Sequence, residues 1–275
     1  MNLTAAMRRF AAAGYAGRSA RCTGRAFVTQ RVGDSRLEGM SPMNVSEVLA
    51  LLDAERDERG MSNWEKLGSG TAGMRSYGIG LTRLRKLAKQ IGRDRELAHA
   101  LWKTDVYEAR VIALLVDDPA RITREQAEKQ VEELAGGMLA YVFASCDSAL
   151  AKTSFVVELA DQWVRSDDPV RRACGYGLLY EASKFSGKKA PSEEFFLAHV
   201  ERIADTIGAE SENVRLAMGT ALMGIGKRSA VLNRAALKVA RAVGPIEFTS
   251  ISGECDPFDV VKHLTADRLK EKLGV

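Results

Sequence analysis

Residues 167–173 have the sequence Asp-Asp-Pro-Val-Arg-Arg-Ala, and residues 212–217 have the sequence Glu-Asn-Val-Arg-Leu-Ala. The two Val-Arg pairs lie 44 residues apart, and each pair follows an acidic turn and opens an apolar helical pattern. A looser copy, with Asp105, Val106 and Arg110, lies earlier in the chain. Such a recurrence indicates a repeated structural unit.

A period of about 40–47 residues with two helices per unit is typical of HEAT-like repeats. Apolar residues three and four apart predict helices on both sides of these turns, and no alternation is sustained enough to indicate a sheet. We therefore predict an all-α fold, an α-solenoid of degenerate HEAT-like repeats with a concave, locally basic face. The first helix is predicted to begin after Asn44 and to stop at Gly60, and the helical starts are predicted at Asp105, Thr123 with Gln126, Asp168, Ser211 and Ser229.

The charge of the chain is unevenly distributed. Of 40 basic and 36 acidic side chains, residues 1–42 contribute seven arginines and two acids, so residues 43–275 carry 33 basic and 34 acidic ones. Nucleic-acid binding would therefore need a local patch rather than net charge. We predict a single helical-repeat domain over residues 43–275. For residues 1–42 we favour a disordered basic extension over a transit-type presequence or a nucleic-acid-binding arm.

Cysteine and histidine give no sign of a metal centre. The four cysteines form no C-x-x-C pair, and the three histidines are scattered, so we predict no metal and no cofactor. This cysteine pattern also indicates a reducing, cytoplasmic setting. No apolar run approaches the ~20 residues that span a bilayer, so no membrane partner is expected.

Residues 141–147, Tyr-Val-Phe-Ala-Ser-Cys-Asp, contain one carboxylate at the end of an apolar stretch. An acid among apolar neighbours is costly unless it is hydrogen-bonded, paired or used. Two interpretations remain open at this point. Asp147 either caps a helix that begins near Ser148 or takes part in chemistry.

Several short motifs occur along the chain in a fixed order: 77–81 with Leu84-Arg85, Leu101-Trp102, Tyr107-Glu108-Ala109-Arg110, Ser145-Cys146-Asp147, 168–173 and Ile225-Gly226-Lys227-Arg228. Taken together, they resemble bacterial DNA alkylation repair proteins of the AlkD type, which are helical-repeat glycosylases. The resemblance covers roughly residues 45–240.

The resemblance implies a DNA repair protein that binds duplex DNA with alkylated bases and hydrolyses the N-glycosidic bond of alkylated purines. Asp147 matches the family's catalytic aspartate. Phe143 and Thr220 stand where the family has tryptophans that contact the damaged nucleotide, and Arg172 matches an arginine that holds a phosphate. A carboxylate of this kind stabilises an oxocarbenium-like state and orients water.

Further contacts with the DNA backbone are predicted for a set of residues at repeat positions and helix ends: Tyr77, Arg110, Arg171, Arg215, Lys227 and Arg228. Arginines at such positions also commonly pair with the adjacent acidic turn, and lysines at helix ends offset helix dipoles. The alternative function is therefore a non-catalytic HEAT-repeat scaffold for nucleic acid or protein. In either case we expect a monomer.

Overall fold

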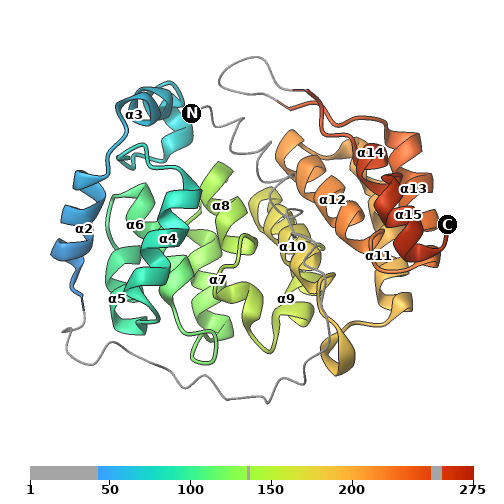
Figure 1. The fold of residues 1–275 in the computed structure, drawn as a ribbon, viewed down its shortest axis with the longest axis horizontal. Helices are drawn as coiled ribbons and strands as arrows, with labels where there is room; N and C mark the ends of the chain where they lie inside the picture. Colours follow the sequence, from blue (N-terminus) through green and yellow to red (C-terminus); the bar gives the residue numbers. More distant parts are fainter. Residues whose placement is uncertain (1–42, 135–136, 249–255) are drawn as a thin grey trace, which may run out of the picture.

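The computed structural model describes residues 43–134, 137–248 and 256–275 (Figure 1). The predicted extension over residues 1–42 lies outside the described residues. Within them no sheet forms, and the only β contacts are two isolated bridges, Arg75 with Val106 and Ile246 with Phe258. The predicted all-α class is confirmed.

The chain folds into a succession of short helices joined by tight turns. In order they are α2 (Val45–Ala54), α3 (Glu58–Glu65), α4 (Leu81–Ile91), α5 (Arg95–Trp102), α6 (Tyr107–Val116), α7 (Arg124–Glu132), α8 (Gly137–Ala144), α9 (Val156–Trp163), α10 (Pro169–Ala182), α11 (Glu193–Thr206), α12 (Glu212–Ile225), α13 (Ala230–Val243), α14 (Val260–Leu264) and α15 (Asp267–Leu273), with 3-10 turns at Gly68–Thr71, Leu150–Lys152, Gly187–Lys189 and Ile207–Ala209.

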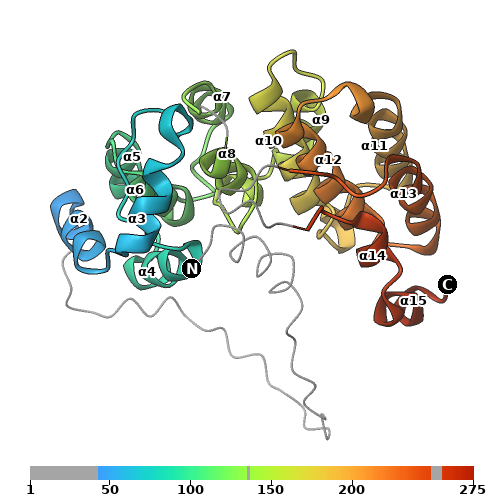
Figure 2. The same cartoon turned by 90° about the horizontal axis from the view of Figure 1, so that it is seen from above.

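The helices form two rows, as an α-solenoid of paired helices requires (Figure 2). The outer row consists of α5, α7, α9, α11 and α13, and the inner row of α6, α8, α10 and α12, with α4 on the inner side at one end and α14 and α15 at the other. Helix α10 packs against its outer partner α9 and its inner neighbours α8 and α12. Cys174 and Gly177 of α10 lie against Ala140 and Ala144 of α8, so these two helices run parallel. Arg172 contacts Glu210 just before α12, and Ser183 lies against Gly224 near its end, so α12 runs parallel to them and their amino-terminal ends share one edge.

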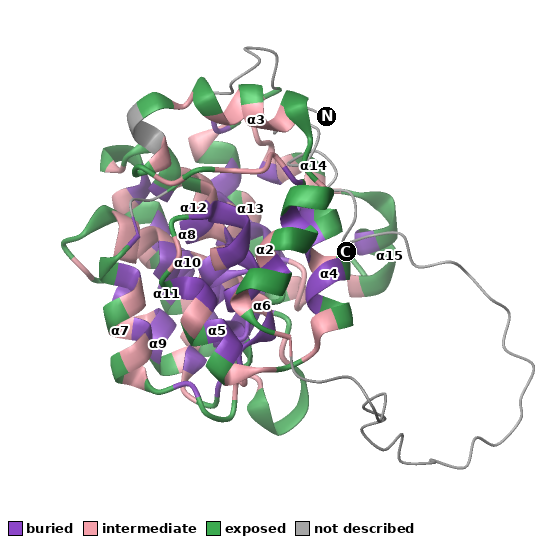
Figure 3. Cartoon of the chain, turned by 90° about the vertical axis from the view of Figure 1, so that its left-hand side faces the viewer, coloured by how far each residue is buried: buried purple, intermediate pink, exposed green. Residues whose placement is uncertain are grey.

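One cluster of buried side chains continues from Val48 on α2 to Leu269 on α15. Its largest fully buried members include Trp163, Tyr176 and Phe196. Figure 3 shows the buried residues along the sides of the helices that face one another and the exposed ones on the outside. Burial of such apolar surface, at ~25 cal/mol per Å², is the main force that holds the repeats together.

Two glycines let the inner helices approach closely. A Cβ on Gly177 of α10 would lie 2.9 Å from the Cβ of Ala144 on α8, and one on Gly224 of α12 would lie 2.4 Å from Ser183 Oγ. Both distances are below ordinary van der Waals contact. The absence of a side chain at these positions therefore sets the spacing of α8, α10 and α12.

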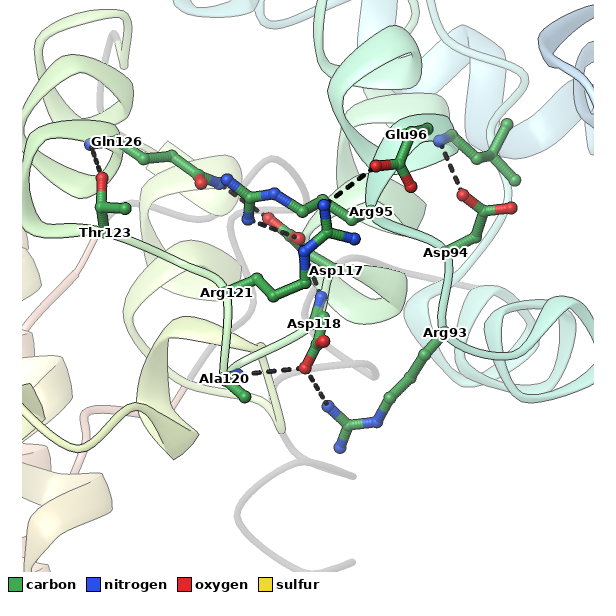
Figure 4. A network of polar contacts seen from close by, with 11 residues as sticks. Arg93, Asp94, Arg95, Glu96, Asp117, Asp118, Ala120, Arg121, Thr123 and Gln126 are labelled. Carbon is green, nitrogen blue, oxygen red and sulfur yellow. Dashed lines mark hydrogen bonds and ion pairs between the residues drawn. The ribbon is translucent and has the colours of Figure 1, made fainter. Parts of the chain in front are cut away.

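Polar contacts tie neighbouring units together away from the apolar core. At the end of α6, Asp117 accepts hydrogen bonds from Arg95 Nη1 at 3.4 Å and from Gln126 Nε2 at 2.7 Å, which joins α5, α6 and α7 (Figure 4). Arg121 reaches Glu96 across the same turn at 3.1 Å. Asp117 is buried, so this paired arrangement is what makes its charge tolerable.

The helical starts agree with the predicted ones in most cases. Asp168 caps α10 with Pro169 in the first turn, and Ser229 caps α13. Thr123 caps α7, but Gln126 bonds Asp117 instead of completing a capping box. Ser211 is the N-cap residue of α12 without a side-chain bond.

Two local predictions are wrong. Gly60 does not end the first helix, because α2 stops at Ala54 and Asp57 caps a new helix that contains Gly60. The N-cap residue of α6 is Val106 rather than Asp105, whose side chain pairs with Arg75 at 3.2 Å.

Candidate functional site

The Asp147 turn follows α8 directly. Two serines close it, since Ser145 Oγ donates to the carbonyl of Tyr141 at 2.5 Å and Ser148 Oγ donates to that of Phe143 at 2.9 Å. The amide of Ala149 then donates to the carbonyl of Leu114 on α6 at 2.8 Å. These bonds fix the path of the chain on either side of the carboxylate.

Cys146 and Asp147 both have positive φ angles, 57° and 67°. A left-handed conformation costs a residue other than glycine on the order of 1–3 kcal/mol, and it persists only when the surroundings determine it. Strained residues of this kind cluster at functional sites. The hydrogen bonds of the turn therefore offset the conformational cost and hold Asp147 in one place.

The Asp147 side chain is 70% exposed and lies 3.3 Å from Arg85 Nη2 on α4. Its own carbonyl accepts a hydrogen bond from Lys152 Nζ at 2.8 Å. It caps no helix, because the next 3-10 turn begins after Ala149 and has no side-chain cap. The helix-cap interpretation is therefore wrong, and Asp147 presents an ion-paired carboxylate to solvent.

Phe143 lies in the core rather than at the surface. Its side chain is fully buried, stacked on Trp163 at a centroid distance of 6.0 Å and tilted against Trp102 at 6.5 Å. It therefore offers no face to a base, which corrects the contact that the resemblance implied. Helix α8 turns this position inward, and a hydrophobic ring is most stable there.

Arg172 is engaged within the protein. Its Nε and Nη2 each lie 2.8 Å from a carboxylate oxygen of Glu210, and Nη1 donates to the carbonyls of Ser166 and Asp167 at 2.7 and 2.8 Å. Glu210 raises the pKa of the guanidinium. Because all three guanidinium nitrogens are already bonded within the protein, Arg172 cannot bind a phosphate in a bidentate manner. This corrects the phosphate contact that the resemblance implied.

Arg172 occupies a position that recurs in the repeats. Arg110, Arg172 and Arg215 are each the fourth residue of an inner helix. Arg110 Nε donates to the carbonyl of Thr104 at 2.9 Å, which is the same six-residue return that Arg172 makes to Ser166. Arg215, among the described residues, makes no such side-chain bond.

Two other predicted backbone contacts, Arg171 and Arg228, and the predicted substrate contact Thr220 are also engaged within the protein. Arg171 pairs with Glu128 at 2.8 Å, and Arg228 Nη1 donates to the carbonyl of Phe185 at 2.9 Å while lying over the Phe196 ring. Thr220 Oγ1 donates to the carbonyl of Leu216 at 2.9 Å. Arg171 and Arg228 therefore link neighbouring elements of the stack, whereas the Thr220 bond stays within α12.

Tyr77 lies in a loop that a buried acid organises. Glu108, fully buried on α6, accepts hydrogen bonds from Ser76 Oγ at 2.6 Å and from the amides of Tyr77 and Ile79 at 3.0 and 3.2 Å. Three donors compensate the charge of the buried carboxylate. The structure thereby joins two separate motifs, and it leaves the half-buried Tyr77 ring beside Arg75.

Several residues near Asp147 were not singled out from the sequence as site residues. Cys146 lies within hydrogen-bonding range of Tyr141 and close enough to Tyr180 and Glu181 for electrostatic interaction. Lys184 Nζ lies 2.8 Å from Glu181 Oε2 and 4.2 Å from the Tyr180 ring centroid. We call this group the Asp147 cluster: Arg85, Tyr141, Cys146, Asp147, Tyr180, Glu181 and Lys184.

The electrostatics of the cluster follow from its partial burial. Desolvation raises the pKa of the Cys146 thiol and of the Tyr180 phenol, so both are protonated at neutral pH. Burial and the nearby Lys184 lower the pKa of Lys227, at the end of α12. Two cations thus lie close together here, and one of them, Lys184, is paired with Glu181.

The described residues contain no group of three or more His, Cys, Asp or Glu side chains placed to hold a metal ion. In the same part of the chain, none of the helices has the length and apolar character needed to cross a bilayer.

The sequence profile of the family described as DNA alkylation repair enzyme matches residues 45–246. The chain belongs to this family. Its curated relatives include the uncharacterized proteins Lmo0209 of Listeria monocytogenes and Lin0241 of Listeria innocua. The first is 22% identical over 198 residues, or 71% of this chain and 85% of the relative, and the second is 22% identical over 194 residues, or 70% and 83%.

A solved structure has the same fold. It is described as "A new family of proteins related to the HEAT-like repeat DNA glycosylases with affinity for branched DNA structures". The TM-score is 0.71 at 23% identity, and the match covers 84% of this chain and 97% of the other. The HEAT-like solenoid and the suspected family are both confirmed.

Proposed function

We propose that this protein binds duplex DNA with alkylated bases and that Asp147 promotes hydrolysis of the N-glycosidic bond of an alkylated purine. The observation that carries the proposal is the Asp147 carboxylate, which is 70% exposed and held by a strained, hydrogen-bonded turn. Membership of the DNA alkylation repair enzyme family supports it. The proposal includes a monomer in the cytoplasm, where the free thiols of Cys146 and Cys174 would stay reduced.

The chemistry suits a single carboxylate. An N3- or N7-alkylated purine is already cationic, so it departs neutral when the glycosidic electron pair moves onto it. Asp147 stabilises the positive charge that develops on the sugar, and water then adds at C1′ with its proton passing to the carboxylate. Arg85, at 3.3 Å from Oδ2, fixes the orientation of the carboxylate and covers one side of it. The sugar would approach from the other side.

Cations on the inner side supply attraction for the DNA backbone. Arg85 is joined on the exposed part of α4 by Lys86 and Lys89, and Lys184 and Lys227 lie at the ends of α10 and α12. Arg215 extends the set at the amino-terminal edge. A local patch of this kind supports DNA binding without a basic net charge.

A second candidate function is DNA binding without excision. Phe143 is buried, Thr220 is bonded to its own helix and Arg172 is saturated by Glu210. The site therefore lacks the aromatic and phosphate contacts that the resemblance implies around the aspartate. These three positions favour a protein that binds DNA but does not excise a base from it.

The two candidates are separated by the release of free methylated purine from alkylated duplex DNA. We expect wild type to release it and Asp147→Asn, which keeps size and loses charge, to be slower by roughly 10²–10³-fold. A wild type that binds DNA in a salt-sensitive manner and releases no base would establish the second candidate. Equal release by wild type and Asp147→Asn would remove Asp147 from the chemistry.

A further inference from the structure

Helix α13, the last helix of the outer row, differs in charge from the other outer helices (Figure 2). Residues 213–246 contain six basic and no acidic side chains, and three of the basic ones lie on α13. We call these three the α13 stripe: Arg234, Lys238 and Arg241. The outer helices α5, α7, α9 and α11 each contain at least one acid. Exposed surfaces normally mix charges of both signs, so the single sign of α13 calls for an explanation.

The α13 stripe lies on the side of the helix that faces away from the inner row. Its residues are spaced four and three apart along the chain, and all three are exposed. On the buried side of the helix, Asn233 Nδ2 donates to the carbonyl of Gly226 at the end of α12 and to that of Leu264 on α14, at 2.9 and 3.2 Å. Since a helix makes a full turn in ~3.6 residues, the stripe lies opposite to these contacts.

Interactions within the protein do not account for the α13 stripe. Within residues 43–134, 137–248 and 256–275, none of the three side chains forms a hydrogen bond or an ion pair. Arg241 lies in the last turn of α13, where a cation is favourable beside the carboxyl end of a helix. That effect falls off within one turn, so it does not explain Arg234 and Lys238. The stripe is therefore available to an anionic partner.

The length and chemistry of the α13 stripe fit one strand of duplex DNA. From Arg234 to Arg241 the helix rises by ~10 Å, at ~1.5 Å per residue. One strand of a duplex has a phosphate for every ~3.4 Å of its axis, so about three phosphates lie along that length. Two of the three residues are arginines, whose planar guanidinium groups pair with phosphate in a bidentate manner. A regular line of phosphates can thus meet all three cations at once.

We propose that the α13 stripe binds the phosphate backbone of a second DNA segment while a first segment lies on the inner side. DNA on the inner side cannot reach the stripe, because α12 and α14 lie between them. A chain with both surfaces holds two short duplexes, or two parts of one long duplex. This inference rests on the DNA binding of the proposed function, but it does not require that Asp147 excise a base.

The test is the number of duplexes that one full-length chain binds at low salt. It is measured by sedimentation with a duplex of about one helical turn (~10 base pairs). We expect two duplexes for wild type and one for the variant with Arg234→Gln, Lys238→Gln and Arg241→Gln. Glutamine is a good helix former, so this variant should stay folded, which thermal unfolding checks.

The matched control removes three exposed cations from another part of the surface. It combines Lys103→Gln, Arg121→Gln and Lys129→Gln, which change the net charge by the same amount, and it should still bind two duplexes. Two duplexes on the α13 variant, or only one on the control, would overturn the inference.

Acetylation of lysines, followed by mass spectrometry, shows where each duplex lies. We expect excess duplex to protect Lys238 in wild type, and an unchanged rate at Lys238 would overturn the inference. Protection of Lys238 by polyglutamate but not by duplex would also overturn it, because α13 would then bind an acidic protein. Protection of Lys238 without protection of Lys184 would refute DNA binding on the inner side and retain the α13 site. Base release is measured separately, and its absence would refute the role of Asp147 alone.

Discussion

The amino-terminal edge of the inner helices and the Asp147 cluster both contain charged residues, but they use them in opposite ways. At the edge, Arg110, Arg171 and Arg172 are bonded to turn carbonyls and to acids of adjacent units. In the cluster, Asp147 is 70% exposed and Glu181 keeps an unpaired oxygen. Saturated charges hold repeats in register, whereas the exposed Asp147 carboxylate can meet a ligand.

The comparison also separates two kinds of arginine at one repeat position. Arg172 and Arg215 are each the fourth residue of a parallel inner helix, yet Arg172 has a bidentate partner in Glu210 and Arg215 has none among the described residues. Position in the repeat therefore does not determine the role. The role of the arginine is determined by whether the neighbouring turn carries an acid that can pair with it.

The largest change in the free energy of unfolding is expected from a substitution at the amino-terminal edge of the inner helices. Arg172→Ala leaves Glu210, whose side chain is 12% exposed, as an uncompensated buried charge, and should lower the free energy of unfolding by roughly 3 kcal/mol. Arg215→Ala should lower it by less than about 0.5 kcal/mol. Urea denaturation measures both. Equal losses would mean that the two positions do not differ as described.

The pH dependence of the unfolding free energy tests a third position, the buried His199 on the outer helix α11. Burial lowers the pKa of His199 to about 4, against a partial opposing effect of Asp161. The unfolded chain therefore binds a proton that the folded chain excludes between about pH 6.5 and 4. The stability that neutral His199 contributes is full above about pH 6.5 and declines by about 3 kcal/mol as the pH falls to 4.

His199→Gln should flatten this part of the curve of unfolding free energy against pH. His99→Gln, at an exposed position of α5, is the control and should leave it unchanged. An identical pH dependence in wild type and His199→Gln would show that the slope comes from carboxylates alone.

The DNA-binding role of the cluster can be sharpened with one lysine. Lys184→Gln removes a cation at the end of α10 and should reduce the slope of log Kd against log salt by about one. Lys129→Gln, on the outer helix α7, should leave the slope as it is. The opposite pattern would assign DNA binding to the outer row.

The smallest expected effect concerns strain in the turn. Asp147→Gly relieves the left-handed conformation and should raise the free energy of unfolding by about 0.5–1 kcal/mol while base release is lost. Ala72→Gly, at another positive φ of 51°, should stabilise similarly without affecting release. A destabilised Asp147→Gly would show that the Arg85 contact outweighs the strain.

The sequence predicted the parts of the fold that depend on local patterns. The 44-residue spacing of Val170 and Val214 indicated the repeat, and Asp168 and Ser229 cap helices as their types suggest. It could not show that α8 points Phe143 inward or that Glu210 reaches Arg172. Both depend on packing between units that are distant in sequence.

Only the central residue of the candidate site, Asp147, was predictable from the sequence. Asp147 stood out because an acid ended an apolar stretch, whereas Glu181 and Tyr180 lie on an ordinary amphipathic helix with no local signal. Their relation to Asp147 arises from the parallel packing of α8 and α10, which brings Ala144 against Gly177. A repeat protein builds its site from one helix end per unit, so linear motifs show only part of it.

The most direct test of the central claim, that DNA lies on the Asp147 cluster, is a lysine footprint. The acetylation rate of each lysine is measured by mass spectrometry with and without a saturating duplex. We predict that Lys184 becomes protected and that Lys129 on the outer row reacts at an unchanged rate. An unchanged rate at Lys184 under saturation would contradict the account.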